Sequence, residues 1–131
     1  MTANTDPIFS LTPVIGIGAI SSANTNRDGT GTIVSVISGS TDGTRITRVT
    51  IQAIVTTTAG MVRLYINTGA VIYLWKEIAV TAITGSASVV EFTYVLSLMG
   101  ENALILPSGY SLEASTHNAE AFNVIAEGGN Y

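Results

Sequence analysis

The chain has 131 residues and a net charge of −4, with only 11% charged residues against 47% hydrophobic ones. Its length fits one folded domain, and its sparse positive charge excludes the clustered cations that a nucleic-acid surface needs. The longest nearly apolar run, residues 69–75, is far shorter than the ~20 residues of a membrane-spanning helix, and the absence of cysteine excludes disulfides and thiolate chemistry. So apolar a chain favours assembly with other protein surfaces.

The first ten residues are mostly polar and predict a flexible arm, residues 1–10, ahead of a single β-sandwich domain at residues 11–131. The last part of this arm contains Asp6, Pro7, Ile8 and Phe9. We expect these four residues to dock onto a partner surface.

Apolar and polar residues alternate with a period of two along most of the remaining chain, as in half-buried strands. The expected strands lie near 8–18, 31–38, 45–57, 61–67, 71–82, 88–98, 103–106, 109–115 and 121–126. Turn-forming pairs such as Asp28-Gly29 separate them, and the best helix candidate, residues 113–121, contains poor helix formers. About nine short strands predict an all-β, antiparallel, jelly-roll-like sandwich.

Two loops carry side chains that could bind or react. The run from Asn24 to Gly29 places oxygen donors at alternate positions, as a calcium loop does, but Ser35 replaces the bidentate glutamate, so we interpret the run as a turn. His117 is the only histidine, with Glu120 nearby and no second histidine or cysteine to complete a metal site. We expect His117 to lie in the loop between the last two strands, as a contact or a pH-sensitive hinge.

Three further patterns suggest enzymes, and each is incomplete. The run GIG at 16–18 begins like a dinucleotide fingerprint, but Ser21 stands in place of the third glycine and no helix follows. The run GSTDG at 39–43 has Thr41 at its centre and also lacks a helix. The nine acidic residues show no paired motif, so a glycosidase would need two of them to meet in space. We therefore predict no enzymatic activity, catalytic residue, cofactor or metal ion.

Aromatic residues gather on two of the expected strands. Tyr73 and Trp75 lie two residues apart, beside Ile72, and Tyr65 lies on the preceding strand. Such a stripe could stack on sugar rings, but aromatic residues in a sandwich more often fill the core or a subunit interface. We predict that Tyr65, Ile72, Tyr73 and Trp75 are core or interface anchors.

Four segments cover most of the chain from residue 24 to its end: NTNRDGTGTIVSV, GTRITRVTIQAIVTTTAGMVRLYI, LWKEIAVTAIT and LPSGYSLEASTHNAEAFNVIAEGGNY. The motifs at 56–64 and 106–126 stand out within them. These segments resemble a family of small structural proteins encoded among the virion genes of tailed bacteriophages and prophages.

The resemblance implies a virion protein and offers no catalytic residue. Within that class we expect a capsid decoration, or cement, protein that forms a homotrimer and binds the major capsid protein. It would lie on the capsid surface after assembly in the host cytoplasm, without contact to nucleic acid or membrane. The alternative is a receptor- or glycan-binding module of a tail or fibre.

Overall fold

The computed structural model describes residues 9–131, so Asp6, Pro7 and Ile8 lie outside the described residues and their docking role stays a prediction. Regular structure in this part of the chain consists of β-strands and a short 3-10 turn at Gly100–Asn102. The strands are β1 (Thr12–Ile20), β2 (Val34–Ser38), β3 (Thr44–Ala53), β4 (Gly60–Asn67), β5 (Ile72–Val80), β6 (Thr93–Ser97), β7 (Leu104–Leu106), β8 (Ser111–Thr116) and β9 (Phe122–Asn130). Each expected strand is present, with its ends displaced by a few residues.

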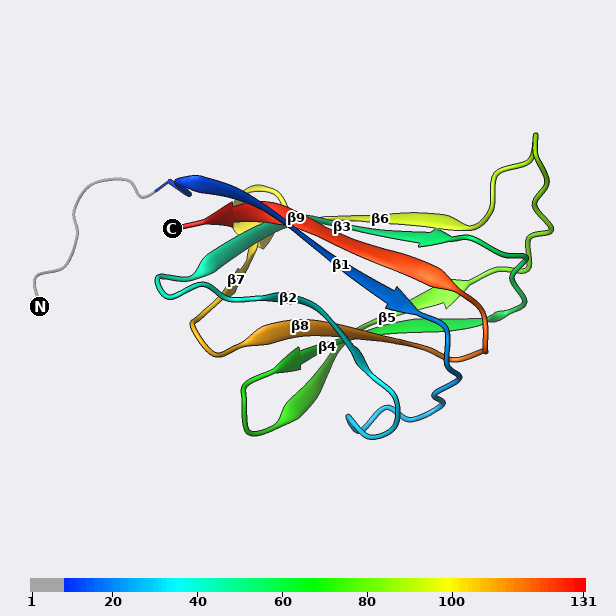
Figure 1. The fold of residues 1–131 in the computed structure, drawn as a ribbon, viewed down its shortest axis with the longest axis horizontal. Coiled ribbons are helices and arrows are strands. Elements are labelled where there is room, and N and C mark those ends of the chain that lie inside the picture. The colour runs from blue at the N-terminus through cyan, green and yellow to red at the C-terminus, as the bar shows by residue number, and fades with distance from the viewer. Residues whose placement is uncertain (1–8) are drawn as a thin grey trace, which may run out of the picture.

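The strands form two antiparallel sheets that pack face to face (Figure 1). One, which we name the β1 sheet, has the order β1-β9-β3-β6, with the short β7 pairing with the end of β3. The other, the β2 sheet, has the order β2-β8-β4-β5. The first and last strands thus pair with each other, and the chain crosses repeatedly between the sheets, as it does in a jelly roll. The predicted jelly-roll-like sandwich is confirmed.

The core between the sheets is mainly aliphatic. Phe92 and Phe122 supply its aromatic part, with ring centroids 6.3 Å apart in an edge-to-face arrangement. The largest fully buried aliphatic side chains are Ile46, Ile51, Leu64, Leu106, Leu112, Val49, Val62 and Val124. They come from both sheets, so the two layers are held together by one continuous apolar contact.

The alternation expected from the sequence fails at two strand ends. We predicted a strand over residues 45–57, but β3 ends at Ala53 and Val55 is 39% exposed. We predicted a strand over residues 88–98, but β6 begins only at Thr93 and Val90 is 74% exposed. In both places the chain has left the sheet before the apolar pattern ends, so these side chains have no opposite layer to contact.

Candidate functional site

Strand β4 is buried on both of its faces. Val62 and Leu64 face the core as expected, but Arg63 and Tyr65 on the opposite face are only 2% and 0% exposed. Alternation along a strand of a sandwich predicts that such positions face solvent. The cover consists of residues 21–33, which we name the covering loop, and which lie beside the layer that contains β8 and β4 (Figure 1).

The covering loop is held by hydrogen bonds at its start. The backbone N–H of Asn24 donates to the Thr116 carbonyl oxygen at 2.8 Å. The buried amide of Asn24 donates to the carbonyl oxygens of Thr30 and Thr32 at 2.9 and 3.0 Å. Hydrogen bonds from the hydroxyl and the N–H of Thr30 hold the pKa of Asp28 below its ordinary value. The side chains of Asn24 and Asp28 therefore bond within the loop itself, in agreement with its interpretation as a turn.

Buried Arg63 is the centre of the polar network under the loop. Its Nε donates to Glu77 Oε2 at 3.1 Å, and its Nη1 donates to the Asn24 carbonyl oxygen at 3.2 Å. Arg27, from the loop, donates to the same oxygen of Glu77 at 2.8 Å. The hydrogen bond from Arg27, joined by that from Arg63, lowers the pKa of Glu77. One carboxylate of β5 thus joins the loop to β4.

Tyr65 completes this attachment. Its hydroxyl donates to the Asn26 carbonyl oxygen at 2.8 Å, and the Ser115 hydroxyl lies 3.5 Å from it. A buried phenol needs such a partner, because an unbonded hydroxyl away from water costs free energy. Tyr65 is therefore an anchor between the β2 sheet and its own covering loop.

His117 lies at the edge of the same network. Its Nδ1 is 3.4 Å from both terminal nitrogens of Arg63. Because a guanidinium group only donates, Nδ1 must accept, which puts the proton of a neutral imidazole on Nε2. Glu120 accepts instead from the N–H and hydroxyl of Thr58. A hollow of about 390 Å³ is lined by His117, Arg27 and residues of β4 and β5.

The predicted anchors on β5 have three different surroundings. A β-bulge places Trp75 as an extra residue in the strand, half-buried against the core, with Lys76 Nζ 5.6 Å from the ring centroid. Tyr73 is 58% exposed. Ile72 is half-buried and lies against the backbone of Gly29 in the covering loop. The aromatic residues therefore do not form one exposed stripe.

The outer face of the β1 sheet has no comparable cover from residues 9–131. Its strand registers place Ile17, Ile125, Thr50 and Val95 side by side across all four strands, and we name this set the bare row. Ile17 is 61% exposed and Val95 is 52% exposed. Three aliphatic side chains and a threonine, side by side on an open sheet face, are typical of a contact surface.

A second row lies next to the bare row. It consists of Ile15, Glu127, Arg48 and Ser97, and we name it the charged row. Arg48 and Glu127 form an ion pair in which the two side chains are 52% and 34% exposed. Exposed pairs of this kind contribute about 0–1 kcal/mol to folding, so the pair is better placed to serve recognition.

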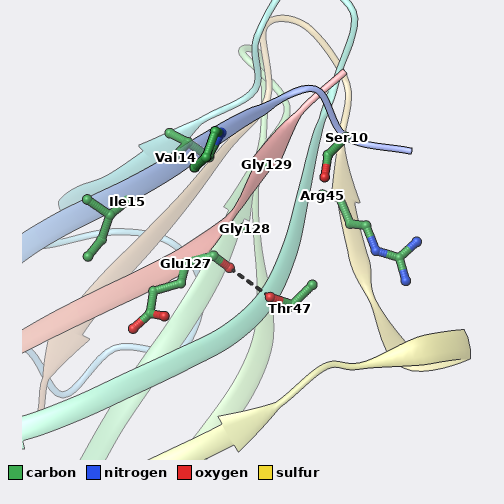
Figure 2. Close-up of a pocket in the computed structure, with 9 residues that line it drawn as sticks. Ser10, Val14, Ile15, Arg45, Thr47, Glu127, Gly128 and Gly129 are labelled. Carbon is green, nitrogen blue, oxygen red and sulfur yellow. Dashed lines mark hydrogen bonds between the residues drawn. The ribbon is translucent and has the colours of Figure 1, made fainter. Parts of the chain in front are cut away.

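A hollow of about 500 Å³ opens at the end of this face, where β1, β9 and β3 meet (Figure 2). Glycine backbone forms part of its lining, and a Cβ at Gly128 would lie 1.8 Å from the Arg45 carbonyl oxygen. Thr47, at a β-bulge of β3, donates its hydroxyl to the Glu127 carbonyl oxygen at 3.3 Å. The side chains of Arg45 and Glu127 lie on opposite sides of the hollow (Figure 2).

The end of the expected docking arm lies at the same corner of the molecule. Of residues 6–9, Phe9 falls in the described range, and it is 77% exposed. Ser10 lines the hollow, and the N–H of Leu11 donates to the Asn130 carbonyl oxygen at 2.7 Å. Residues 9–11 therefore lie at a corner of the outer face of the β1 sheet.

No residue of the bare row or the charged row was predicted from the sequence to be part of a site. A signal was present in β1, where Gly16 and Gly18 alternate with Ile15 and Ile17. A Cβ at Gly16 would lie 2.4 Å from the Val36 carbonyl oxygen, so the glycines face the closely packed β2 and the isoleucines face outward. A strand that alternates glycine with isoleucine thus indicates a close crossing on one side and an open apolar face on the other.

Comparison with known proteins finds no match to a protein-family model, a curated protein or a solved structure. Among residues 9–131, no three histidine or acidic side chains come together in a way that could hold a metal ion. Over the same range, no helix has the length and apolar character needed to cross a membrane. The two outer faces of the sandwich, one covered and one open, are the candidate functional surfaces.

Proposed function

We propose that the chain is a structural protein of a tailed-phage virion, which decorates the capsid and bridges its subunits without catalysing a reaction. The bare row is the observation that carries the proposal, because a row of exposed aliphatic side chains beside paired charges suits a protein–protein contact. The four segments that resemble phage virion proteins, which cover most of the chain from residue 24 to its end, support a place in the virion. Jelly-roll sandwiches also recur in viral capsid domains.

In this role the partners are further copies of the chain, in a homotrimer, and the major capsid protein. The β2 sheet, with the covering loop packed over it, would serve as the rigid support of the capsid-binding protein. The arm, residues 1–10, would reach the capsid, because its described end with exposed Phe9 lies at a corner of the outer face of the β1 sheet. The protein would lie on the capsid surface after assembly in the host cytoplasm.

Binding to capsids tests the proposal. The purified chain is mixed with capsids of the encoding phage that were assembled without it, and the mixture is sedimented. We expect the chain to sediment with the capsids and to raise their melting temperature. A variant that lacks residues 1–8 should keep its far-ultraviolet circular dichroism and lose most of the capsid binding. If the folded native chain stays in the supernatant, the decoration role is wrong.

A glycan-binding module of a tail or fibre is the second candidate, and exposed Tyr73 is the observation that favours it. Jelly-roll folds also serve as lectin domains, and an exposed tyrosine ring can stack on a sugar. A glycan array probed with the native chain and with Tyr73→Ala decides between the two. Binding that the variant loses would place the chain in a receptor-binding role, whereas an empty array would remove this candidate.

A further inference from the structure

We propose that the outer face of the β1 sheet joins two copies of this chain about a twofold axis that runs parallel to the strands, between β9 and β3. The inference goes beyond the virion role and does not depend on it, because it uses only the strand registers and the side chains that they bring to the surface. The partner that covers the outer face of the β1 sheet is thus a second copy of the same chain.

Such an axis lays β9 over the partner's β3, and β1 over the partner's β6. Each row of the face then meets the same row of the second copy in reverse order. In the bare row, Ile17 faces the partner's Val95, and Ile125 faces the partner's Thr50. Every position in the row meets an aliphatic side chain or a threonine methyl group, so the row is complementary to itself.

The charged row is also complementary to itself about this axis. Reversal of the row places Glu127 over the partner's Arg48, and Arg48 over the partner's Glu127. The ion pair within each chain then becomes a square of four alternating charges, an arrangement that favours the correct register and disfavours others. The charges of one copy are thus matched by the charges of the other.

The other twofold axis in the plane of the face, perpendicular to the strands and crossing the bare row, gives a poorer match. It lays Glu127 and Arg48 over the partner's Asn123 and Gln52, so neither charge meets an opposite charge of the second copy. The parallel axis instead pairs Asn123 with the partner's Gln52, and amides can both donate and accept. The bare row, the charged row and the row that contains Asn123 and Gln52 are all complementary about the axis between β9 and β3. We therefore prefer this axis.

The proposed contact is isologous, since both copies use the same surface. Sheets that pack face to face with nearly aligned strands lie about 10 Å apart, which the side chains of these rows can fill. The homotrimer implied by the phage resemblance would need a different, head-to-tail contact. A face with twofold symmetry therefore predicts a mass of two copies, or of two trimers joined back to back.

Charge reversal at the centre of the face tests the contact. Arg48→Glu places four carboxylates together, and Glu127→Arg places four guanidinium groups together, so we expect each variant alone to weaken association at least ~100-fold. An equimolar mixture restores opposite charges across the axis, and sedimentation should show the native mass again. Recovery in the mixture also shows that both variants are folded.

A matched lysine pair provides the second arm of the test. Ile17→Lys should dissociate the two copies of the chain. Val71→Lys makes the same change of net charge in the β4–β5 turn and should leave the native mass unchanged. A native mass of one copy or three copies at micromolar concentration would overturn the proposal, as would a mixture of charge variants that stays dissociated. Variants that dissociate and still bind capsids would leave the virion role intact, so the two proposals fail separately.

Discussion

The two outer faces of the sandwich are made from strands of the same alternating kind, but within residues 9–131 only one of them is covered by another part of the chain. On the β2 sheet, the covering loop buries Arg63 and Tyr65, and both side chains bond to its backbone. On the β1 sheet, Ile17 and Val95 remain more than half exposed. The covered face presents Arg63 and Tyr65 to its cover, and the open face presents an aliphatic row beside an exposed ion pair.

The covered face contributes to the folding of a single chain, whereas the open face contributes to association between chains. Burial of a guanidinium or a phenol costs free energy unless its polar atoms find hydrogen-bond partners. The covering loop supplies these partners to Arg63 and Tyr65, so their hydrogen bonds hold the loop in its position. Aliphatic side chains on the open face contribute little to a single chain, because water still surrounds them. They release that water only when another surface covers them.

The largest effect is expected at the covered face. Tyr65→Ala removes a fully buried ring and the hydroxyl that binds the Asn26 carbonyl oxygen, and should lower the free energy of unfolding by about 3–5 kcal/mol. Tyr65→Phe keeps the ring and should cost about 1 kcal/mol. Urea unfolding of both variants measures the difference. Equal, small losses would mean that the loop does not depend on this anchor.

Loss of the buried guanidinium should have the next largest effect. Arg63→Met keeps most of the side-chain length but leaves the Asn24 carbonyl oxygen without its charged donor, at a cost of about 1–3 kcal/mol. The amide protons of the covering loop should exchange faster, while those of β3 and β9 change little. Arg48→Met, which breaks an exposed ion pair, is the control; at a protein concentration low enough to keep the chains separate, it should stay within about 0.5 kcal/mol of the native chain.

The fold was accessible from the sequence because the signals for strands and turns are local. Alternation from Val49 to Ala53 identified the buried face of β3, and the pairs Asp28-Gly29 and Asp42-Gly43 marked loops. The jelly-roll topology was inferred only from the number of strands. Their pairing order depends on contacts between distant segments, such as β1 with β9, which no local pattern records.

The candidate sites were less accessible for the same reason. Arg63 looked like an ordinary outward residue of a strand, and only the covering loop, more than thirty positions earlier, makes it buried. The bare row joins four strands that lie far apart in the sequence, so its residues have no common motif. By contrast, the prediction that the stretch between β8 and β9 is a loop needed only its poor helix formers and is confirmed.

Acid should weaken the attachment of the covering loop. Hydrogen bonds from Arg27 and Arg63 hold the pKa of Glu77 below its ordinary value of 4.5, and the pKa of Asp28 is likewise below 3.8. A carboxyl with a lowered pKa stabilises the folded chain above its unfolded value and loses that contribution as pH falls through the lowered one. Stability should therefore decline below pH ~4.5, and Glu77→Gln should flatten this decline. An unchanged pH dependence in the variant would contradict the role of Glu77.

The smallest effect is expected where the open face is made polar in the dilute single chain. Ile17→Thr removes exposed apolar surface from an edge strand that tolerates threonine, so the free energy of unfolding should change by less than about 0.5 kcal/mol. The same substitution should reduce self-association when the protein is concentrated. Unfolding midpoints at low protein concentration measure the change in stability, and their shift at high concentration measures the change in self-association. A loss above about 1 kcal/mol at low concentration would mean that the chain itself covers this face. A neutral result would instead assign the aliphatic side chains of β1 to contacts between molecules, because a residue that does not stabilise the fold gains apolar burial only from a partner.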